Sequence, residues 1–143
     1  MAHQVETNTE RITTAGVMTY RHTIFVAKRT LKGAVGGLWE FPGGKHRWGE
    51  TPKESLRREF KEEFQIEVEV GSCFHTHDFI YRDTLYHLQA YWITSGTSQT
   101  FSLVEHDEIK WVTLEQLAQL DMVPSDQPVR ETLKKLLTGC GWP

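Results

Sequence analysis

The chain has 143 residues, 38% hydrophobic and 24% charged, with a formal net charge of −3. This composition is ordinary for a globular domain with its own core, and the acidic balance argues against nucleic-acid binding through a large basic surface. Cys73 and Cys140 match no metal-ligand spacing, and no apolar run is long enough to span a membrane. We expect one domain over residues 1–143, free thiols, a cytoplasmic location and a flexible N-terminus over residues 1–10.

The first third of the chain predicts two paired strands and a loop. Residues 12–20 and 23–28 are rich in β-forming side chains, and only Arg21 and His22 separate the two runs. Residues 33–38 are glycine-rich and predict a mobile loop.

A strong helix-start signal follows at Thr51. Pro52 stands at the first helical position, and Glu54 lies three residues after Thr51, which together predict a capping box. We expect the helix to run to about Phe64. Its buried stripe has the spacing i, i+4, i+8 and consists of Leu56, Phe60 and Phe64.

The second half predicts further strands and helices in irregular order. The strands are expected at residues 66–70, 84–94 and 109–112, and the helices at 114–120 and 128–137. This irregular alternation favours a mixed sheet between helices over a repeating βαβ fold.

Three carboxylates crowd one side of the helix that starts at Thr51. Glu59, Glu62 and Glu63 fall within roughly 100° of each other on an α-helix, and like charges at i, i+4 oppose folding by a few tenths of a kcal/mol. Such a cluster supplies the ligands that Mg²⁺ or Mn²⁺ need, and the preceding glycines, among them Gly44, allow close backbone approach. A solvated acidic helix is the alternative, but the spacing favours a metal site that holds phosphates.

The segment resembles a known family. Gly44-x5-Glu50-x7-Arg58-Glu59-Phe60-x-Glu62-Glu63-x-Gln65-Ile66 is similar to the Nudix box of pyrophosphohydrolases, with Gln65 in place of the final glycine. Residues 38–45, 105–112 and 124–128 are similar to MutT-like members. The resemblance implies an α/β fold, a Nudix α/β/α sandwich with a central mixed β-sheet. The altered position lies where the helix ends, so it bears on the local turn and not on the metal site.

The resemblance also implies an activity and a cofactor. The reaction would be hydrolysis of a nucleoside triphosphate to a monophosphate and pyrophosphate, a housecleaning of the nucleotide pool. The cofactor, Mg²⁺ or Mn²⁺, would be held by the Gly44 carbonyl, Glu59, Glu62, Glu63 and Glu105. The catalytic residues would be the same four glutamates and Arg58, which would orient a glutamate of the cluster. Glu59 and Glu105 are both candidates for the general base.

The substrate-binding residues follow from the same resemblance and from side-chain chemistry. Phe41 and Trp39 are candidates for the apolar wall of a base site, although Trp39 could equally be core. Asp126 could read the base edge or cap the last helix. Lys45 and Arg29 would add positive charge for the phosphates, with a base or sugar contact as the alternative for Arg29.

Several substrates stay open. An ionised aspartate accepts hydrogen bonds only and suits the amino group of cytosine, whereas a protonated one could also admit 8-oxoguanine. CTP, dCTP and 8-oxo-dGTP are therefore all candidates. The rivals are hydrolysis of dinucleoside polyphosphates, for which Tyr81 or Tyr86 is available, hydrolysis of RNA 5′ ends, and an inactive nucleotide-binding Nudix module. We expect a nucleotide as partner, with no membrane and no stable nucleic-acid complex; the sequence predicts no oligomeric state.

Overall fold

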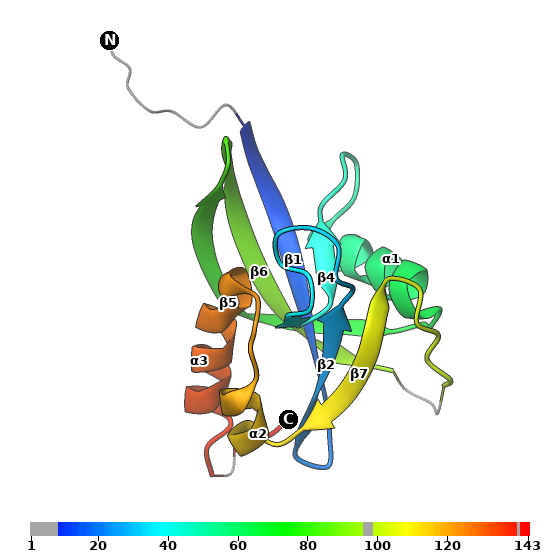
Figure 1. The fold of residues 1–143 in the computed structure, drawn as a ribbon, viewed down its shortest axis with the longest axis vertical. Coiled ribbons are helices and arrows are strands. Elements are labelled where there is room, and N and C mark those ends of the chain that lie inside the picture. Colours follow the sequence, from blue (N-terminus) through cyan, green and yellow to red (C-terminus); the bar gives the residue numbers. More distant parts are fainter. Residues whose placement is uncertain (1–8, 96–98, 140) are drawn as a thin grey trace.

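The computed structural model describes residues 9–95, 99–139 and 141–143. In these ranges seven strands form one sheet in the order β3-β2-β1-β6-β5, with β4 paired to β1 and β7 paired to β2 (Figure 1). The strands are β1 (Thr9–Tyr20), β2 (Thr23–Arg29), β3 (Trp39–Glu40), β4 (Gly43–Lys45), β5 (Glu69–Tyr81), β6 (Thr84–Thr94) and β7 (His106–Val112). Because β1 pairs with β6 in parallel and the other pairs are antiparallel, the sheet is mixed.

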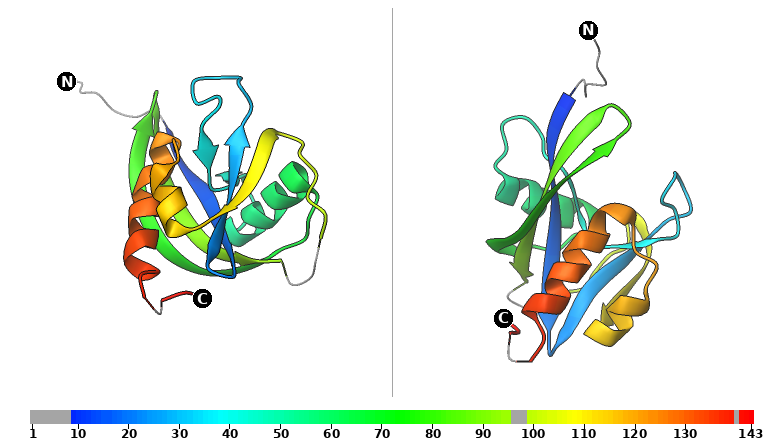
Figure 2. Two further views of the ribbon diagram at one scale, coloured as in Figure 1. Left: turned by 60° about the horizontal axis from the view of Figure 1, so that its bottom comes forward. Right: turned by 90° about the vertical axis from the view of Figure 1, so that its left-hand side faces the viewer.

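Helices cover both faces of this sheet. They are α1 (Pro52–Phe64), α2 (Leu114–Gln119) and α3 (Gln127–Leu136), with a 3₁₀ turn η1 (Pro124–Asp126) before α3. Figure 2 shows α1 on one side of the twisted sheet and α2 with α3 on the other. Strand β2 alternates between two cores: Ile24 and Val26 pack with α2 and α3, and Phe25 and Ala27 pack with α1. The expected α/β/α sandwich with a mixed sheet is confirmed.

Helix α1 forms as its sequence signals predict. The Thr51 hydroxyl accepts the Glu54 N–H at 3.1 Å, and the Glu54 carboxylate accepts the Thr51 N–H at 2.8 Å. The stripe of Leu56, Phe60 and Phe64 is fully buried. A Cβ at Gly16 on β1 would lie 2.6 Å from the Phe60 ring, so this glycine lets α1 approach the sheet. None of the helices in the described ranges is long and apolar enough to cross a membrane.

One strand prediction needs correction, and two short strands were not predicted. The strand expected at residues 66–70 begins only at Glu69, and it continues to Tyr81. Ile66 and Val68 lie on irregular backbone, and their side chains are buried in the core on the α1 side. The alternating pattern therefore indicated which residues are buried, but it did not indicate a strand. The short strands β3 and β4 were not predicted, because two or three residues carry no periodic signal.

The C-terminal end of α1 has a left-handed residue. Gln65 has φ 58° and ψ 39°, a conformation that favours glycine. Two carbonyls at this end of the helix are bonded by a distant segment: Phe64 O accepts the Ser102 N–H at 2.9 Å, and Glu63 O accepts the Val104 N–H at 3.3 Å. The turn thus forms without the family's glycine.

Replacing Gln65 with glycine should stabilise the protein by about 0.5–1 kcal/mol. Relief of the left-handed conformation gains roughly 1–2 kcal/mol, and the added freedom of glycine in the unfolded chain costs about 0.4–1 kcal/mol. Thermal unfolding followed by circular dichroism should show a rise in Tm of about 2–4 °C per kcal/mol. Gln65→Ala keeps the conformational strain and serves as the control; equal stability of the two variants would contradict the prediction.

Candidate active site

Glu50 ties the loop before α1 to the helix. Its carboxylate accepts hydrogen bonds from Arg58 Nε at 2.5 Å, from Arg58 Nη2 at 3.1 Å and from the Arg47 N–H at 2.9 Å. The hydrogen bond from Arg58 is the main reason that the pKa of Glu50 falls to about 2. Arg58 Nη2 also donates to the Lys45 carbonyl at 3.2 Å, so this ion pair fixes the loop on the helix.

The same guanidinium reaches two of the clustered carboxylates. Arg58 Nη1 lies 3.6 Å from Glu59 Oε2 and 3.2 Å from Glu62 Oε1. A single planar cation therefore contacts Glu50, Glu59 and Glu62. The role of Arg58 in orienting the cluster stays a prediction.

Gly44 allows β4 to lie directly against the cluster. A Cβ at this position would be 1.9 Å from Glu59 Oε2, so no other residue fits without displacing that carboxylate. The antiparallel pairing with Thr14 on β1 sets the strand in place, and the Thr14 hydroxyl donates to the Gly44 carbonyl at 3.1 Å.

The two inner carboxylates, Glu59 and Glu63, are both largely buried. Glu63 is 4% exposed, and its Oε1 has no hydrogen-bond partner among the described residues. Burial, followed by the charges of Glu40 and Glu59, raises the pKa of the Glu63 carboxyl well above its usual range. Burial also raises the pKa of Glu59, although its hydrogen bond with Glu63 and the charge of Arg58 oppose the rise.

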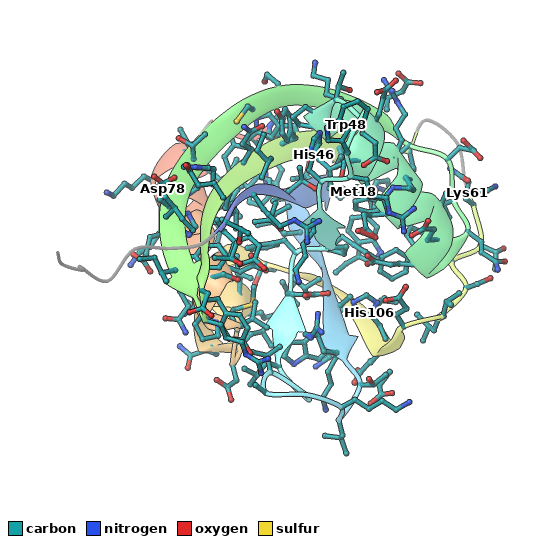
Figure 3. All side chains as sticks on the ribbon, turned by 90° about the horizontal axis from the view of Figure 1, so that it is seen from above. Met18, His46, Trp48, Lys61, Asp78 and His106 are labelled. Atoms are coloured by element: carbon teal, nitrogen blue, oxygen red, sulfur yellow. The ribbon has the colours of Figure 1, made fainter. Side chains whose placement is uncertain are left out.

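A cavity of about 430 Å³ opens over these carboxylates. The sequence-predicted residues that line it are Arg29, Gly44, Lys45, Arg58, Glu59, Glu62, Glu63 and Glu105. The cavity is also lined by Arg11, Thr30, Glu40, Gly43, Arg47 and His106. In Figure 3 His46 and Trp48 lie near the start of α1, and His106 lies across from them beside β7.

Three predicted substrate-binding residues do not line this cavity. Trp39 and Phe41 are buried in the core under α2 and α3. Asp126 is 4% exposed, makes no cap hydrogen bond to α3, and accepts the Phe41 N–H at 2.8 Å instead. Burial, and then the charge of Glu40, raises the pKa of Asp126 to about 8. A role for these three residues in binding the base stays a prediction.

Among the lining residues that the sequence did not reveal, Glu40 and His106 are hydrogen-bonded to each other. Glu40 accepts from Arg29 Nη1 at 3.1 Å and is hydrogen-bonded to His106 Nε2 at 2.7 Å. His106 Nε2 also lies 4.0 Å from Glu63 Oε1. Glu40 stands between the two buried aromatic residues Trp39 and Phe41. Because side chains alternate between the two faces of a strand, this position could have indicated that Glu40 points away from the core. His106 lies in an acidic run that resembles a solvated loop, so no sequence signal marked it.

The donor set fits a hard divalent cation. It consists of carboxylate oxygens and a backbone carbonyl, the ligands that Mg²⁺ and Mn²⁺ prefer. The unpartnered Glu63 Oε1 and the raised pKa values of Glu59 and Glu63 indicate a place where a cation would replace a proton.

The model of the NUDIX domain family matches residues 10–133. The chain belongs to the Nudix family. The expected enzyme class, a Nudix pyrophosphohydrolase, is confirmed by this match and by relatives named for that activity.

Two curated relatives show the range of related Nudix enzymes. The CTP pyrophosphohydrolase of Escherichia coli strain K12 is 33% identical over 113 residues, which cover 79% of this chain and 83% of the relative. The 8-oxo-dGTP diphosphatase of Proteus vulgaris is 47% identical over 68 residues, which cover 46% of this chain and 61% of the relative.

Solved structures share the fold over nearly the whole chain. The solution structure of the E. coli ORF135 protein superposes with a TM-score of 0.80 at 28% identity, covering 91% of this chain and 92% of that one. The MutT protein from Methanosarcina mazei Go1 gives a TM-score of 0.75 at 22% identity, covering 88% and 91%.

Proposed function

We propose that this Nudix hydrolase cleaves a nucleoside triphosphate to a nucleoside monophosphate and pyrophosphate, with Mg²⁺ or Mn²⁺ as cofactor. The observation that carries the proposal is the shared cavity. Its wall combines the carboxylates of one helix with the Gly44 backbone and several cationic side chains. Carboxylates for a cation beside cations for phosphates are the components that phosphoryl transfer requires.

Each residue in this proposal has a defined task. Glu59, Glu62, Glu63 and Glu105 would hold the cation together with the Gly44 carbonyl. Once bound, the cation would neutralise charge on the phosphate oxygens and lower the pKa of the attacking water. Arg58 keeps Glu59 and Glu62 in place, and Glu59 or Glu105 would take the proton from the water. Lys45 and Arg29 would attract the phosphates.

For the base we propose cytosine or an oxidised purine. The names of the curated relatives support this choice, as does the chemistry of Asp126. A carboxyl with a pKa near 8 is largely protonated at neutral pH, so it can both donate and accept hydrogen bonds. Asp126 is buried and does not line the cavity, and its carboxylate accepts the Phe41 N–H. The cytoplasmic location also stays a prediction.

A panel of substrates tests the proposal directly. We expect Mg²⁺-dependent release of pyrophosphate from CTP, dCTP or 8-oxo-dGTP, with loss of activity in a chelator and recovery on adding Mg²⁺ or Mn²⁺. Diadenosine tetraphosphate, ADP-ribose and 5′-triphosphate RNA complete the panel. If none of these nucleotides is hydrolysed in a metal-dependent reaction, the proposal is refuted and the inactive binding module is favoured.

Asp126→Asn is the matched variant for the same panel. An amide cannot change its protonation state, so the variant should alter the ratio of kcat/KM between cytidine and oxidised guanine nucleotides. A uniform change for all bases would show that Asp126 has only a structural task, through its bond to Phe41.

A further inference from the structure

His106 is a buried side chain of the cavity wall to which the proposed reaction gives no task. It is the first residue of β7 and lies beside that strand in Figure 3. It is 6% exposed, lines the cavity, and directly follows Glu105, the one candidate metal ligand that comes from the segment before β7. The position of its imidazole therefore bears on where the Glu105 carboxylate stands.

The imidazole contacts two elements other than its own strand. Its ring stacks on Phe64 of α1, with ring centroids 5.1 Å apart and planes inclined by 14°. Its Nε2 is hydrogen-bonded to Glu40 Oε2 of β3 at 2.7 Å, and because an ionised carboxylate can only accept, Nε2–H is the donor. The same nitrogen lies 4.0 Å from Glu63 Oε1, which is beyond hydrogen-bond distance. The ring is thus held between β3 and the end of α1.

Packing alone does not account for an imidazole at this place. His106 Nδ1 is buried and has no hydrogen-bond partner among the described residues. A buried polar atom without a partner costs about 1–3 kcal/mol, and a phenyl ring would stack on Phe64 without that cost. What the imidazole adds is the hydrogen bond to Glu40, which a phenyl ring cannot make.

The backbone just before His106 is also fastened to the end of α1. The Ser102 N–H donates to Phe64 O at 2.9 Å, and the Val104 N–H donates to Glu63 O at 3.3 Å. Glu105 therefore stands between these backbone bonds and the fixed ring of His106. Because Glu105 lines the same cavity as the carboxylates of α1, its position is set from both sides along the chain.

We propose that His106 is a positioning residue, which holds the Glu105 carboxylate at the distance from the α1 carboxylates that one shared cation requires. It rests on the proposed function, because it uses the same metal site, and it adds a residue to that site. The imidazole touches neither the cation nor the substrate. Its bond to Glu40 and its stack on Phe64 fix the first residue of β7, and the backbone passes this constraint to Glu105. Outer partners that orient metal ligands typically contribute about 10- to 100-fold to metal affinity or activity.

Two replacements of His106 separate its hydrogen bond from its packing. His106→Phe keeps the stack on Phe64 and loses the bond to Glu40, whereas His106→Gln keeps an N–H donor. The affinity of the substrate-free protein for Mn²⁺, measured by electron paramagnetic resonance, should fall about 10- to 100-fold in His106→Phe. His106→Gln should recover most of this loss. Glu40→Met removes the acceptor instead of the donor and gives the same test in a protein that keeps His106.

A double-mutant cycle with Glu105→Gln shows whether His106 acts through Glu105. Glu105→Gln alone should lower the affinity for Mn²⁺, because an amide is a poorer ligand for a hard cation than a carboxylate. His106→Phe and Glu40→Met should then cause little further loss in the Glu105→Gln protein. Losses that add, or an unchanged affinity in Glu105→Gln, would overturn the proposal, because His106 would then have a purely structural task.

His87→Phe is the matched control. His87 is also hydrogen-bonded to carboxylates, Asp78 Oδ1 at 2.8 Å and Glu10 Oε1 at 2.9 Å, but it does not line the cavity. Its replacement should change neither the affinity for Mn²⁺ nor turnover. Unchanged Mn²⁺ affinity in His106→Phe would overturn the positioning task while hydrolysis of CTP left the proposed function standing. Because Mn²⁺ binding needs no turnover, the coupled loss would support the task of His106 even in a protein that hydrolyses no nucleotide.

Discussion

Glu63→Gln is expected to lower kcat by about 10³-fold or more, while the metal-free protein becomes more stable. The substitution replaces a buried ionisable carboxyl with a neutral amide and keeps the shape of the side chain. Activity falls because an amide is a poor ligand for Mg²⁺ and no longer balances its charge. Stability rises by about 1 kcal/mol, or roughly 2–4 °C in Tm, because a neutral amide avoids the cost of burying an ionisable carboxyl and the repulsion from Glu40 and Glu59.

The gain in stability should depend on pH in a defined direction. The pKa of Glu63 is raised in the folded protein above its ordinary value of 4.5. The contribution of Glu63 to the free energy of unfolding is therefore fully present below pH 4.5, and it is lost as the pH rises toward the folded-state pKa. The Tm difference between Glu63→Gln and the unmodified protein should grow over this range, measured by thermal unfolding without divalent metal.

Glu62→Gln is the control for this pair of effects. Glu62 is more exposed than Glu63 and is paired with Arg58, so its replacement should reduce turnover without stabilising the metal-free protein. Added Mg²⁺ should raise the Tm of the unmodified protein more than that of either variant. Near-normal turnover in both variants would mean that the metal cluster is assigned wrongly.

Gly44→Ala should reduce kcat/KM by about 10²-fold with the fold intact. The added methyl group would lie 1.9 Å from Glu59 Oε2, so the carboxylate must leave its position. A displacement of about 1 Å in a catalytic group typically costs about 10²-fold in rate. The φ angle of Gly44 is not positive, so alanine meets no backbone strain at this position.

Gly71→Ala is the control for the effect of replacing any glycine by alanine. A Cβ at Gly71 would meet its nearest neighbour at 3.4 Å, an ordinary contact, so activity should be unchanged. Steady-state kinetics and Mn²⁺ binding should both be measured. Gly44→Ala with normal Mn²⁺ affinity and normal turnover would show that Glu59 has no part in the metal site.

The helix with the carboxylates was predictable because its signals are local. The capping box, the apolar stripe and the spacing of Glu59, Glu62 and Glu63 all lie within one short segment, and the structure reproduces them. Strand β4 could not be predicted in this way. Its three residues are defined by pairing with Thr14 and its neighbours, about thirty positions earlier in the chain.

The remaining part of the site depends on which strands are neighbours. Strand β2 pairs with β3 on one side and with β7 on the other, which brings Arg29, Glu40 and His106 together. Nothing in the linear spacing of these residues indicates that meeting. The same limitation applies to Phe41. Its aromatic ring made it a candidate for stacking on a base, but the fold places it in the core.

Gln65 shows that the fold does not require the glycine with which the family signature ends. The left-handed turn is present, and the backbone of Ser102 and Val104 bonds the carbonyls beside it. A search pattern that insists on glycine at this position would reject the chain, although the carboxylates of α1 line the cavity. In other divergent sequences, a non-glycine residue here should therefore coincide with a segment that can replace the cap.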